Sequence, residues 1–265
     1  MGGGGFRFRS RLERRIVRRA GAAVGDHALI DRNDHVMAAV SGGKDSLALL
    51  EVLHLLRRRS PVPFTITAVT LEQGHGPAGS HVWLQRHYVE SGYAHHFEIA
   101  PIEDVVREKL EQGTIPCSLC SRLRRGVLYT LAGRLGCTKI ALGHHLDDLI
   151  ETLLLNLFYS GQLRTMPPLL RSDDGRNVVI RPLCYVPESW LRQYAENRGF
   201  QATTCGSCAG ADGRRAKVKA LVDQLAMQHP QLRHQMLRAM KNVKPEYLLD
   251  CRLVQGRGIE RAGEE

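Results

Sequence analysis

The sequence lacks any apolar run near the roughly 20 residues that a membrane-spanning helix needs, and its N-terminus has no apolar core of a secretory signal. Cysteine is sparse as well. Seven cysteines in 265 residues are too few for a disulfide scaffold in a chain of this length. We therefore expect a globular, cytoplasmic protein without membrane association, whose cysteines serve metal or redox chemistry in a reducing compartment.

Acidic side chains are also in short supply. The chain has 27 Asp and Glu against 37 Lys and Arg, which gives a net charge of +10 and a pI near 9.5. Such a surplus favours a polyanionic partner over a neutral metabolite, although solubility alone is a second explanation.

The N-terminal stretch 6–20 has arginines at seven positions and a single acid, Glu13. Its apolar residues recur every four positions, which predicts an amphipathic helix docked on the body with arginines outward for phosphates. A mitochondrial transit peptide has the same composition and is the alternative. The apolar positions are Phe8, Leu12, Ile16 and Ala20.

Short apolar or β-branched runs alternate with helical stretches, which is typical of a doubly wound α/β fold around a parallel sheet. We predict a basic helical segment at 1–33, a nucleotide-binding α/β domain at 34–202 and a C-terminal helical region at 203–265. Residues 171–177 have turn composition and predict a loop or hairpin. The predicted strands are 35–40, 64–71, 95–100, 139–143 and 178–182, and the predicted helices are 45–58, 81–91, 103–112, 121–135, 147–159, 214–228 and 231–242.

A glycine-rich string follows the first predicted strand and opens a helix: Ser41, Gly42, Gly43, Lys44, Asp45 and Ser46. The glycines let the backbone turn tightly, and the free N–H groups of a helix start bind phosphate. Lys44 adds a positive charge, Ser46 a hydroxyl and Asp45 a carboxylate able to hold Mg²⁺. A tight strand-to-helix connection is the structural alternative; the string is neither a Walker A nor a G-x-G-x-x-G motif.

A second motif, Gly143-His144-His145-Leu146-Asp147-Asp148, ends the fourth predicted strand. Ligands of open α/β sheets collect at the carboxyl ends of strands, so the two aspartates are well placed for Mg²⁺. A helix N-cap explains one aspartate but not both. Each histidine has a structural explanation as well as a functional one.

Four cysteines form two C-x-x-C pairs, Cys117/Cys120 and Cys205/Cys208, and each pair can chelate a metal or a cluster. Structural zinc, a redox dithiol and an iron–sulfur cluster all fit this pattern. The wide separation of the pairs favours a site built into an active cleft. Cys137, Cys184 and Cys251 stand alone and are expected to serve packing.

The S-G-G-K-D-S string resembles the PP-loop of the N-type ATP pyrophosphatases. Together with C-S-L-C-S-R-L-R-R, G-H-H-x-D-D, the S-D-D-G loop and the R-P-L strand, it resembles the tRNA 2-thiocytidine synthetase family from about Arg7 to about Asp250. The resemblance implies that ATP and Mg²⁺ bind across the loop, Gly143 and the catalytic residues Lys44, Asp45, Asp147 and Asp148.

The resemblance further implies that O2 of an anticodon-loop cytidine, at position 32, is adenylated and then replaced by sulfur. A [4Fe-4S] cluster would be held by Cys117, Cys120 and Cys205, and a cysteine desulfurase would supply the sulfur. The tRNA would contact Arg122, Arg124, Arg125 and the N-terminal arginines, and the enzyme would be a homodimer.

Two segments depart from the family pattern: Leu71-Glu72-Gln73, where an acidic Asp-Gln is usual, and the residues after Cys208. Three alternatives therefore stay open. They are thiolation of another tRNA base such as a uridine, an adenylating ligase with structural zinc, and a non-enzymatic zinc-stabilised RNA-binding module. The last leaves the S-G-G-K-D-S string unexplained.

Overall fold

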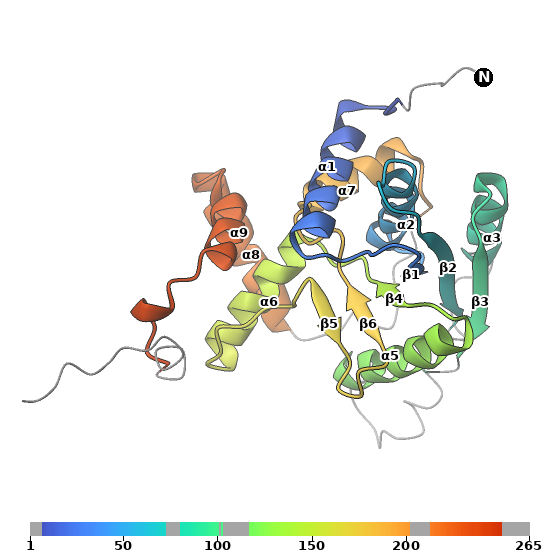
Figure 1. The fold of residues 1–265 in the computed structure, drawn as a ribbon. Helices are drawn as coiled ribbons and strands as arrows, with labels where there is room; N and C mark the ends of the chain where they lie inside the picture. The colour runs from blue at the N-terminus through green and yellow to red at the C-terminus, as the bar shows by residue number, and fades with distance from the viewer. Residues whose placement is uncertain (1–6, 73–79, 101, 103–116, 202–212, 251–265) are drawn as a thin grey trace, which may run out of the picture.

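The computed structural model describes residues 7–72, 80–100, 102, 117–201 and 213–250. Their centre is a six-stranded sheet with the order β3-β2-β1-β4-β6-β5 (Figure 1). All neighbouring strands are parallel except β5 and β6. The strands are β1 (His35–Ala39), β2 (Thr65–Glu72), β3 (His95–Ile99), β4 (Lys139–Ala141), β5 (Leu169–Arg171) and β6 (Val178–Ile180).

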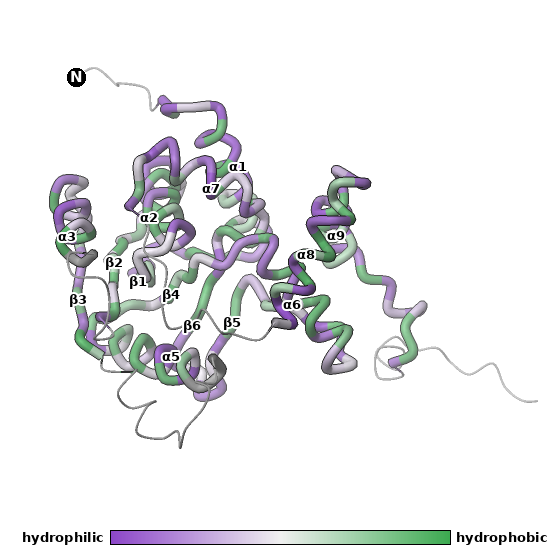
Figure 2. The backbone as a smooth tube through the Cα atoms, turned by 180° about the vertical axis from the view of Figure 1, so that it is seen from behind, coloured by the Kyte–Doolittle hydropathy of each residue, from purple (hydrophilic) through white to green (hydrophobic). Residues whose placement is uncertain are grey.

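Helices cover both faces of this sheet, so the predicted doubly wound α/β fold is confirmed. Figure 1 shows α1, α2 and α7 together on one side and α5 on the other. The strands between them are largely hydrophobic, as the green of β2 and β6 in Figure 2 shows. The helices are α1 (Arg11–Asp26), α2 (Lys44–Arg57), α3 (Ser80–Ser91), α5 (Cys117–Arg134), α6 (Leu146–Tyr159), α7 (Glu188–Asn197), α8 (Gly213–Gln228) and α9 (Leu232–Lys241), followed by a short 3-10 turn, η2 (Pro245–Tyr247).

The strand order reverses between β1 and β4, which pair in parallel with Met37 opposite Ile140. The chain winds from β1 toward β3 in one direction and from β4 toward β5 in the other. In open α/β sheets this switch point leaves a crevice at the carboxyl ends of the strands. The S-G-G-K-D-S string follows β1 and the G-H-H-x-D-D motif follows β4, so both lie at that crevice.

One strand was not predicted. β5 pairs antiparallel with β6, with Leu170 opposite Val179, and the predicted loop at 171–177 is the turn between them. Gly175 takes a positive φ of 70° in this turn, and the Ser172 N–H donates to the Asn177 carbonyl at 2.9 Å. Three residues are too few to show a strand pattern, which is why the sequence did not reveal β5.

Helix α5 begins earlier than predicted. It starts at Cys117 rather than Ser121, so the first C-x-x-C pair lies in the first turn of the helix and not in the segment before it. Pro116 directly precedes this start, and proline suits the first turn of a helix. The helix predicted at 103–112 lies outside the described residues.

Helix α1 is displaced from its predicted range of 6–20. Ser10 caps it by accepting a hydrogen bond from the Glu13 N–H at 3.0 Å, so Phe8 precedes the helix. Ile16 and Ala20 are fully buried, as the predicted docking requires. Arg15 is exposed, and its guanidinium lies 4.0 Å over the ring of Trp190.

Helices α8 and α9 pack against α6 through a separate apolar cluster. Val222 and Leu237 are buried there with Leu149 and Ile150. Within the described part of the chain, no helix is both long and apolar enough to cross a bilayer.

Candidate active site

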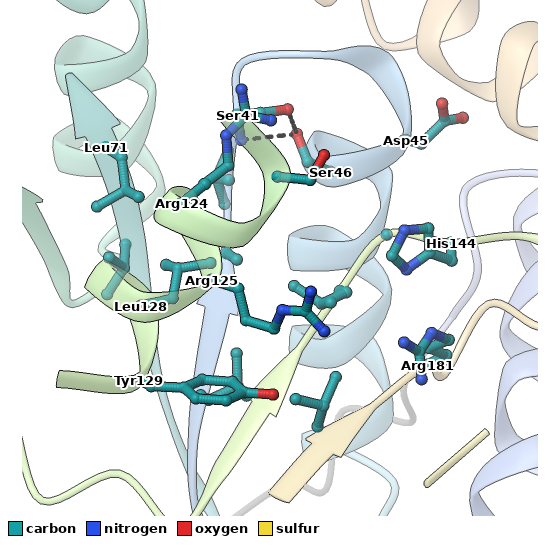
Figure 3. Close-up of a pocket in the computed structure, with 18 of the residues that line it drawn as sticks. Ser41, Asp45, Ser46, Leu71, Arg124, Arg125, Leu128, Tyr129, His144 and Arg181 are labelled. Atoms are coloured by element: carbon teal, nitrogen blue, oxygen red, sulfur yellow. Dashed lines mark hydrogen bonds between the residues drawn. The ribbon is translucent and has the colours of Figure 1, made fainter. Parts of the chain in front are cut away.

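A cavity of about 420 Å³ lies between the carboxyl ends of the strands and helix α5 (Figure 3). It brings together seven of the predicted site residues, from the loop after β1, the motif after β4 and the basic start of α5. These residues are Ser41, Asp45, Ser46, Gly143, Asp148, Arg124 and Arg125.

The glycine-rich loop closes on itself around Ser46. The Ser46 hydroxyl donates to the Gly43 carbonyl at 2.8 Å and accepts from the Ser41 N–H at 3.1 Å. Gly42 has φ of 82°, a conformation that side chains disfavour. Gly43 is the N-cap of α2 and has no side chain to cover the first N–H groups of the helix. The loop therefore presents a helix N-terminus suited to an anion.

Gly143 holds the second motif close to this loop. A Cβ atom at Gly143 would lie 3.1 Å from the backbone of Asp45 and Ser46. That distance is shorter than an ordinary carbon contact, so any side chain here would push the start of α2 away from β4. The backbones of the two motifs thus approach closely at this glycine, and His145 Nε2 lies 3.8 Å from Asp45 Oδ2 beside it.

We predict that Gly143→Ala lowers the rate of ATP–pyrophosphate exchange by about 10-fold, because the backbone of Asp45 and Ser46 must shift by a few tenths of an ångström and a shift of about 1 Å costs about 100-fold. Gly133→Ala is the matched control, since a Cβ there meets nothing within 4 Å. Exchange would be measured on both variants with tRNA present. Equal rates for the two would contradict the close approach.

Two carboxylates face the cavity and form a donor set for a divalent cation. Asp45 Oδ1 is buried and has no hydrogen-bond partner among the described residues, while its Oδ2 accepts from Lys44 Nζ at 2.9 Å. Asp148 lines the same cavity. Mg²⁺ is commonly bound by one or two carboxylates together with phosphate oxygens and water, so this pair fits it.

His145 is structural and His144 faces the cavity. His145 is the N-cap of α6. Its ring Nδ1 accepts from the backbone N–H of Asp148 at 3.4 Å, and its backbone N–H donates to Asp148 Oδ2 at 3.0 Å. Burial and the nearby Arg181 lower the pKa of His144 to about 4. His144 is therefore neutral at physiological pH and its buried Nδ1 lacks a partner among the described residues.

Asp147 does not face the cavity. Its Oδ1 accepts from Arg233 Nε at 2.6 Å and its Oδ2 from the Glu188 N–H at 2.7 Å. The carboxylate is buried and both oxygens are occupied by α9 and α7. Asp147 thus joins three helices, whereas Asp148 remains available at the cavity.

We predict a split between the two aspartates. Asp147→Ala should destabilise the fold by about 2 kcal/mol, because it removes two hydrogen bonds of a buried carboxylate, to Arg233 Nε and the Glu188 N–H, while Arg233 keeps Asp223. Asp148→Asn keeps an acceptor for the α6 cap and should lower ATP–pyrophosphate exchange by about 100-fold with little change in Tm. Thermal unfolding and exchange assays on both variants check this. A stable Asp147→Ala protein without exchange activity would contradict the structural role assigned to Asp147.

Glu188, which the sequence reading missed, links the loop to α8. Its Oε1 lies 3.1 Å from Lys44 Nζ and its Oε2 accepts from Lys219 Nζ at 2.6 Å. Burial alone would raise the pKa of Glu188, but Lys219 and Lys44 lower it to about 2. From α8, Arg215 also reaches the acids of α6, with Nη1 3.5 Å from Asp148 Oδ1.

Three arginines give the cavity a positive wall. Figure 3 shows Arg124 and Arg125 on α5, with His144 and Arg181 across the cavity from them. Arg181 is 7% exposed, donates from Nη1 to the Pro167 carbonyl at 2.6 Å, and has its pKa lowered by burial. Arg181 belongs to the R-P-L motif but had no assigned role. Arg122 faces a different hollow, beside Glu98 and Arg134.

Cys120 directly precedes the lining residue Ser121 and packs against the buried pair Ala100 and Ile102. Its Sγ accepts a long hydrogen bond from Arg124 Nη2 at 3.9 Å, so a thiolate at Cys120 would face a guanidinium that offsets its charge. Cys117 is three residues earlier on the same helix. The Cys117 side chain, Cys205 and Cys208 lie outside the described residues, and among the described ones no three His, Cys, Asp or Glu side chains are grouped to hold a metal.

Comparisons with known proteins agree with this geometry. A family model described as a PP-loop domain matches residues 12–225. Relatives named tRNA-cytidine(32) 2-sulfurtransferase from Burkholderia mallei and Burkholderia pseudomallei are 46% identical over 256 residues, which cover 96% of this chain and 77% of each relative.

Among solved structures, the U34-tRNA thiolase NcsA from Methanococcus maripaludis, with its [4Fe-4S] cluster, superposes with a TM-score of 0.68. It covers 96% of this chain and 91% of its own at 20% identity, which establishes a shared fold. The long match at 46% identity establishes more than the fold. The chain belongs to the tRNA-cytidine 2-sulfurtransferase family of PP-loop enzymes.

Proposed function

We propose that this chain uses ATP to activate O2 of cytidine 32 in the anticodon loop of tRNA and exchanges that oxygen for sulfur, which yields 2-thiocytidine. The observation that carries the proposal is the convergence of the loop after β1, Asp148 and Arg124 of α5 on one cavity, with Cys120 Sγ 3.9 Å from Arg124 Nη2. The names of the 46% identical relatives support the choice of base and position.

In the first step, O2 of the cytidine bonds to the α-phosphorus of ATP and pyrophosphate leaves. The exposed N–H groups at the start of α2 and the charge of Lys44 bind the departing pyrophosphate. Asp45 and Asp148 would hold Mg²⁺, which would neutralise phosphate charge. Arg124, Arg125 and Arg181 form the wall against which the nucleotide charge is placed.

In the second step, sulfide bonds to C2 of the base and AMP leaves with the former O2. A [4Fe-4S] cluster held by Cys117, Cys120 and Cys205 would supply sulfide at its open iron. The guanidinium of Arg124, with Nη2 3.9 Å from Cys120 Sγ, places a positive charge beside this proposed cluster ligand. We further propose a cysteine desulfurase as the source of the sulfur and a homodimer as the assembly.

Binding of tRNA falls to the basic start of α5, where Arg122, Arg124 and Arg125 follow one another within a single turn. Each phosphate contact releases counterions, so the affinity for tRNA should fall steeply as salt rises. A flat dependence of Kd on salt concentration would rule out this mode of binding.

The direct test combines metal analysis with nucleoside analysis. Protein purified without oxygen should contain about four irons and four labile sulfides per chain, as a [4Fe-4S] centre requires. With ATP, Mg²⁺, sulfide and unmodified tRNA, mass spectrometry of the digested product should show 2-thiocytidine. Zinc without iron would overturn the proposed sulfur transfer, and 2-thiouridine in place of 2-thiocytidine would overturn the proposed base.

A further inference from the structure

A second polar cavity lies at the opposite end of α2 from the ATP site. It has a volume of about 100 Å³, and three parts of the chain meet there: the segment before α1, the last turn of α2 and the C-cap of α7. A helix of 14 residues is about 20 Å long, so the two cavities are well separated. The lining residues that matter are Arg7, Arg9, Glu13, Glu51, His54, Arg58 and Arg198.

The two acids of this cavity are already engaged. Glu51 accepts from Arg198 Nη2 at 2.6 Å and Nε at 2.7 Å, and from the Tyr194 hydroxyl at 2.7 Å. Glu13 accepts from the Arg9 N–H at 2.8 Å. Both carboxylates are almost completely buried, so neither has free surface to offer an incoming cation.

The cations of the cavity outnumber these acids. Four arginines face two glutamates, which leaves two positive charges. Among the described residues, no carboxylate pairs with the side chain of Arg7, Arg9 or Arg58. The helix ends nearby contribute about half a charge each, positive from α1 and negative from α2 and α7, so about one and a half positive charges remain in the cavity.

His54 adds an unused polar atom to the same cavity. It is 7% exposed, and its buried Nε2 has no hydrogen-bond partner among the described residues. Its ring stacks on Tyr93 with centroids 3.9 Å apart. Burial and the neighbouring Arg57 and Arg58 lower the pKa of His54 to about 4, so the ring is neutral and donates through one nitrogen only.

We propose that this cavity binds one phosphate group, with His54 Nε2 donating a hydrogen bond and Arg7, Arg9 and Arg58 supplying charge. The remaining surplus of about one and a half positive charges suits a single phosphate group, either a phosphodiester monoanion or inorganic phosphate, and the volume suits a phosphate rather than a nucleoside. The group comes either from the tRNA backbone or from free inorganic phosphate. The tRNA source rests on the proposed function, whereas the phosphate site itself does not.

The first arm of the test uses inorganic phosphate and the full chain, with the ATP site filled by an α,β-methylene ATP analogue. The ¹⁵N resonance of His54 Nε2, assigned with His54→Phe, should shift and saturate. The shift should vanish in Arg58→Ala and in Arg9→Ala, which come from different elements. Arg57→Ala is the matched control, because Arg57 is exposed on the same turn and does not line the cavity.

The second arm measures tRNA binding. If the tRNA backbone fills the site, Arg58→Ala should weaken tRNA affinity about tenfold and lower the salt slope by about one, relative to Arg57→Ala. An unchanged tRNA affinity with a saturable phosphate shift identifies free phosphate as the ligand. A His54 resonance that responds equally to sodium chloride, together with unchanged tRNA affinity, overturns the site whether or not thiolation is observed.

Discussion

Replacement of Lys44 by Met is expected to reduce ATP–pyrophosphate exchange by about 100- to 1,000-fold, because a preorganised cation at a developing phosphate charge contributes that much. Lys44 Nζ lies 2.9 Å from Asp45 Oδ2 and 3.1 Å from Glu188 Oε1. Burial alone would lower the pKa of Lys44, but these two acids raise it overall, so the charge is secure at any physiological pH. Exchange of radiolabelled pyrophosphate into ATP with tRNA present is the measurement.

The matched control for Lys44 is Arg192→Met. Arg192 Nη2 also contacts Glu188 Oε1, at 3.3 Å, but its side chain is exposed and lies on α7, outside the S-G-G-K-D-S string. An exposed pair of this kind contributes little to stability. If the two variants lost exchange activity equally, the role of Lys44 would be reduced to holding Glu188.

Replacement of Cys120 by Ser is expected to remove the iron and abolish thiolation while ATP–pyrophosphate exchange continues. A serine oxygen is a poor ligand for an iron–sulfur cluster, whereas adenylation depends on the loop after β1 and on Asp148. Iron and labile sulfide would be determined on protein purified without oxygen, beside the exchange rate and the yield of thiolated nucleoside.

Cys137→Ser serves as the control for the Cys120 variant. Cys137 lies behind β1, with Sγ 3.7 Å from His35 Nδ1, and burial raises the pKa of its thiol to about 11. A thiol of this kind is not a metal ligand, so iron should be retained. Full iron content in Cys120→Ser would exclude Cys120 from the cluster.

The sheet could be predicted from the sequence because each parallel strand is a short apolar run between helical segments. The ends of β1, β2, β3, β4 and β6 lie close to their predicted limits. The position of the loop after β1 beside the motif after β4 also followed, since both come after strands of one sheet. The short β5 and the early start of α5 did not, because three residues have no periodicity and a cysteine pair has no helical signature.

The limits of sequence reading are clearest at Asp147 and Glu188. The two aspartates of the second motif are adjacent and chemically identical, and only the contacts of Arg233 and Glu188 with Asp147 separate their roles. Those partners come from α7 and α9, distant in sequence, and no local pattern points to them. Arg181 belongs to the R-P-L motif that the sequence analysis noted, but only the fold shows that it lines the cavity.

The ion pairs of Asp147 with Arg233 and of Glu188 with Lys219 tie α8 and α9 to the nucleotide-binding core. A segment exchanged between relatives must therefore keep both ion pairs. A chimera that takes residues 213–250 from another protein would bury the Asp147 carboxylate without its cation unless the donor supplies an arginine at the position of Arg233. The C-terminal helices and the core therefore have to be inherited, or engineered, as one unit.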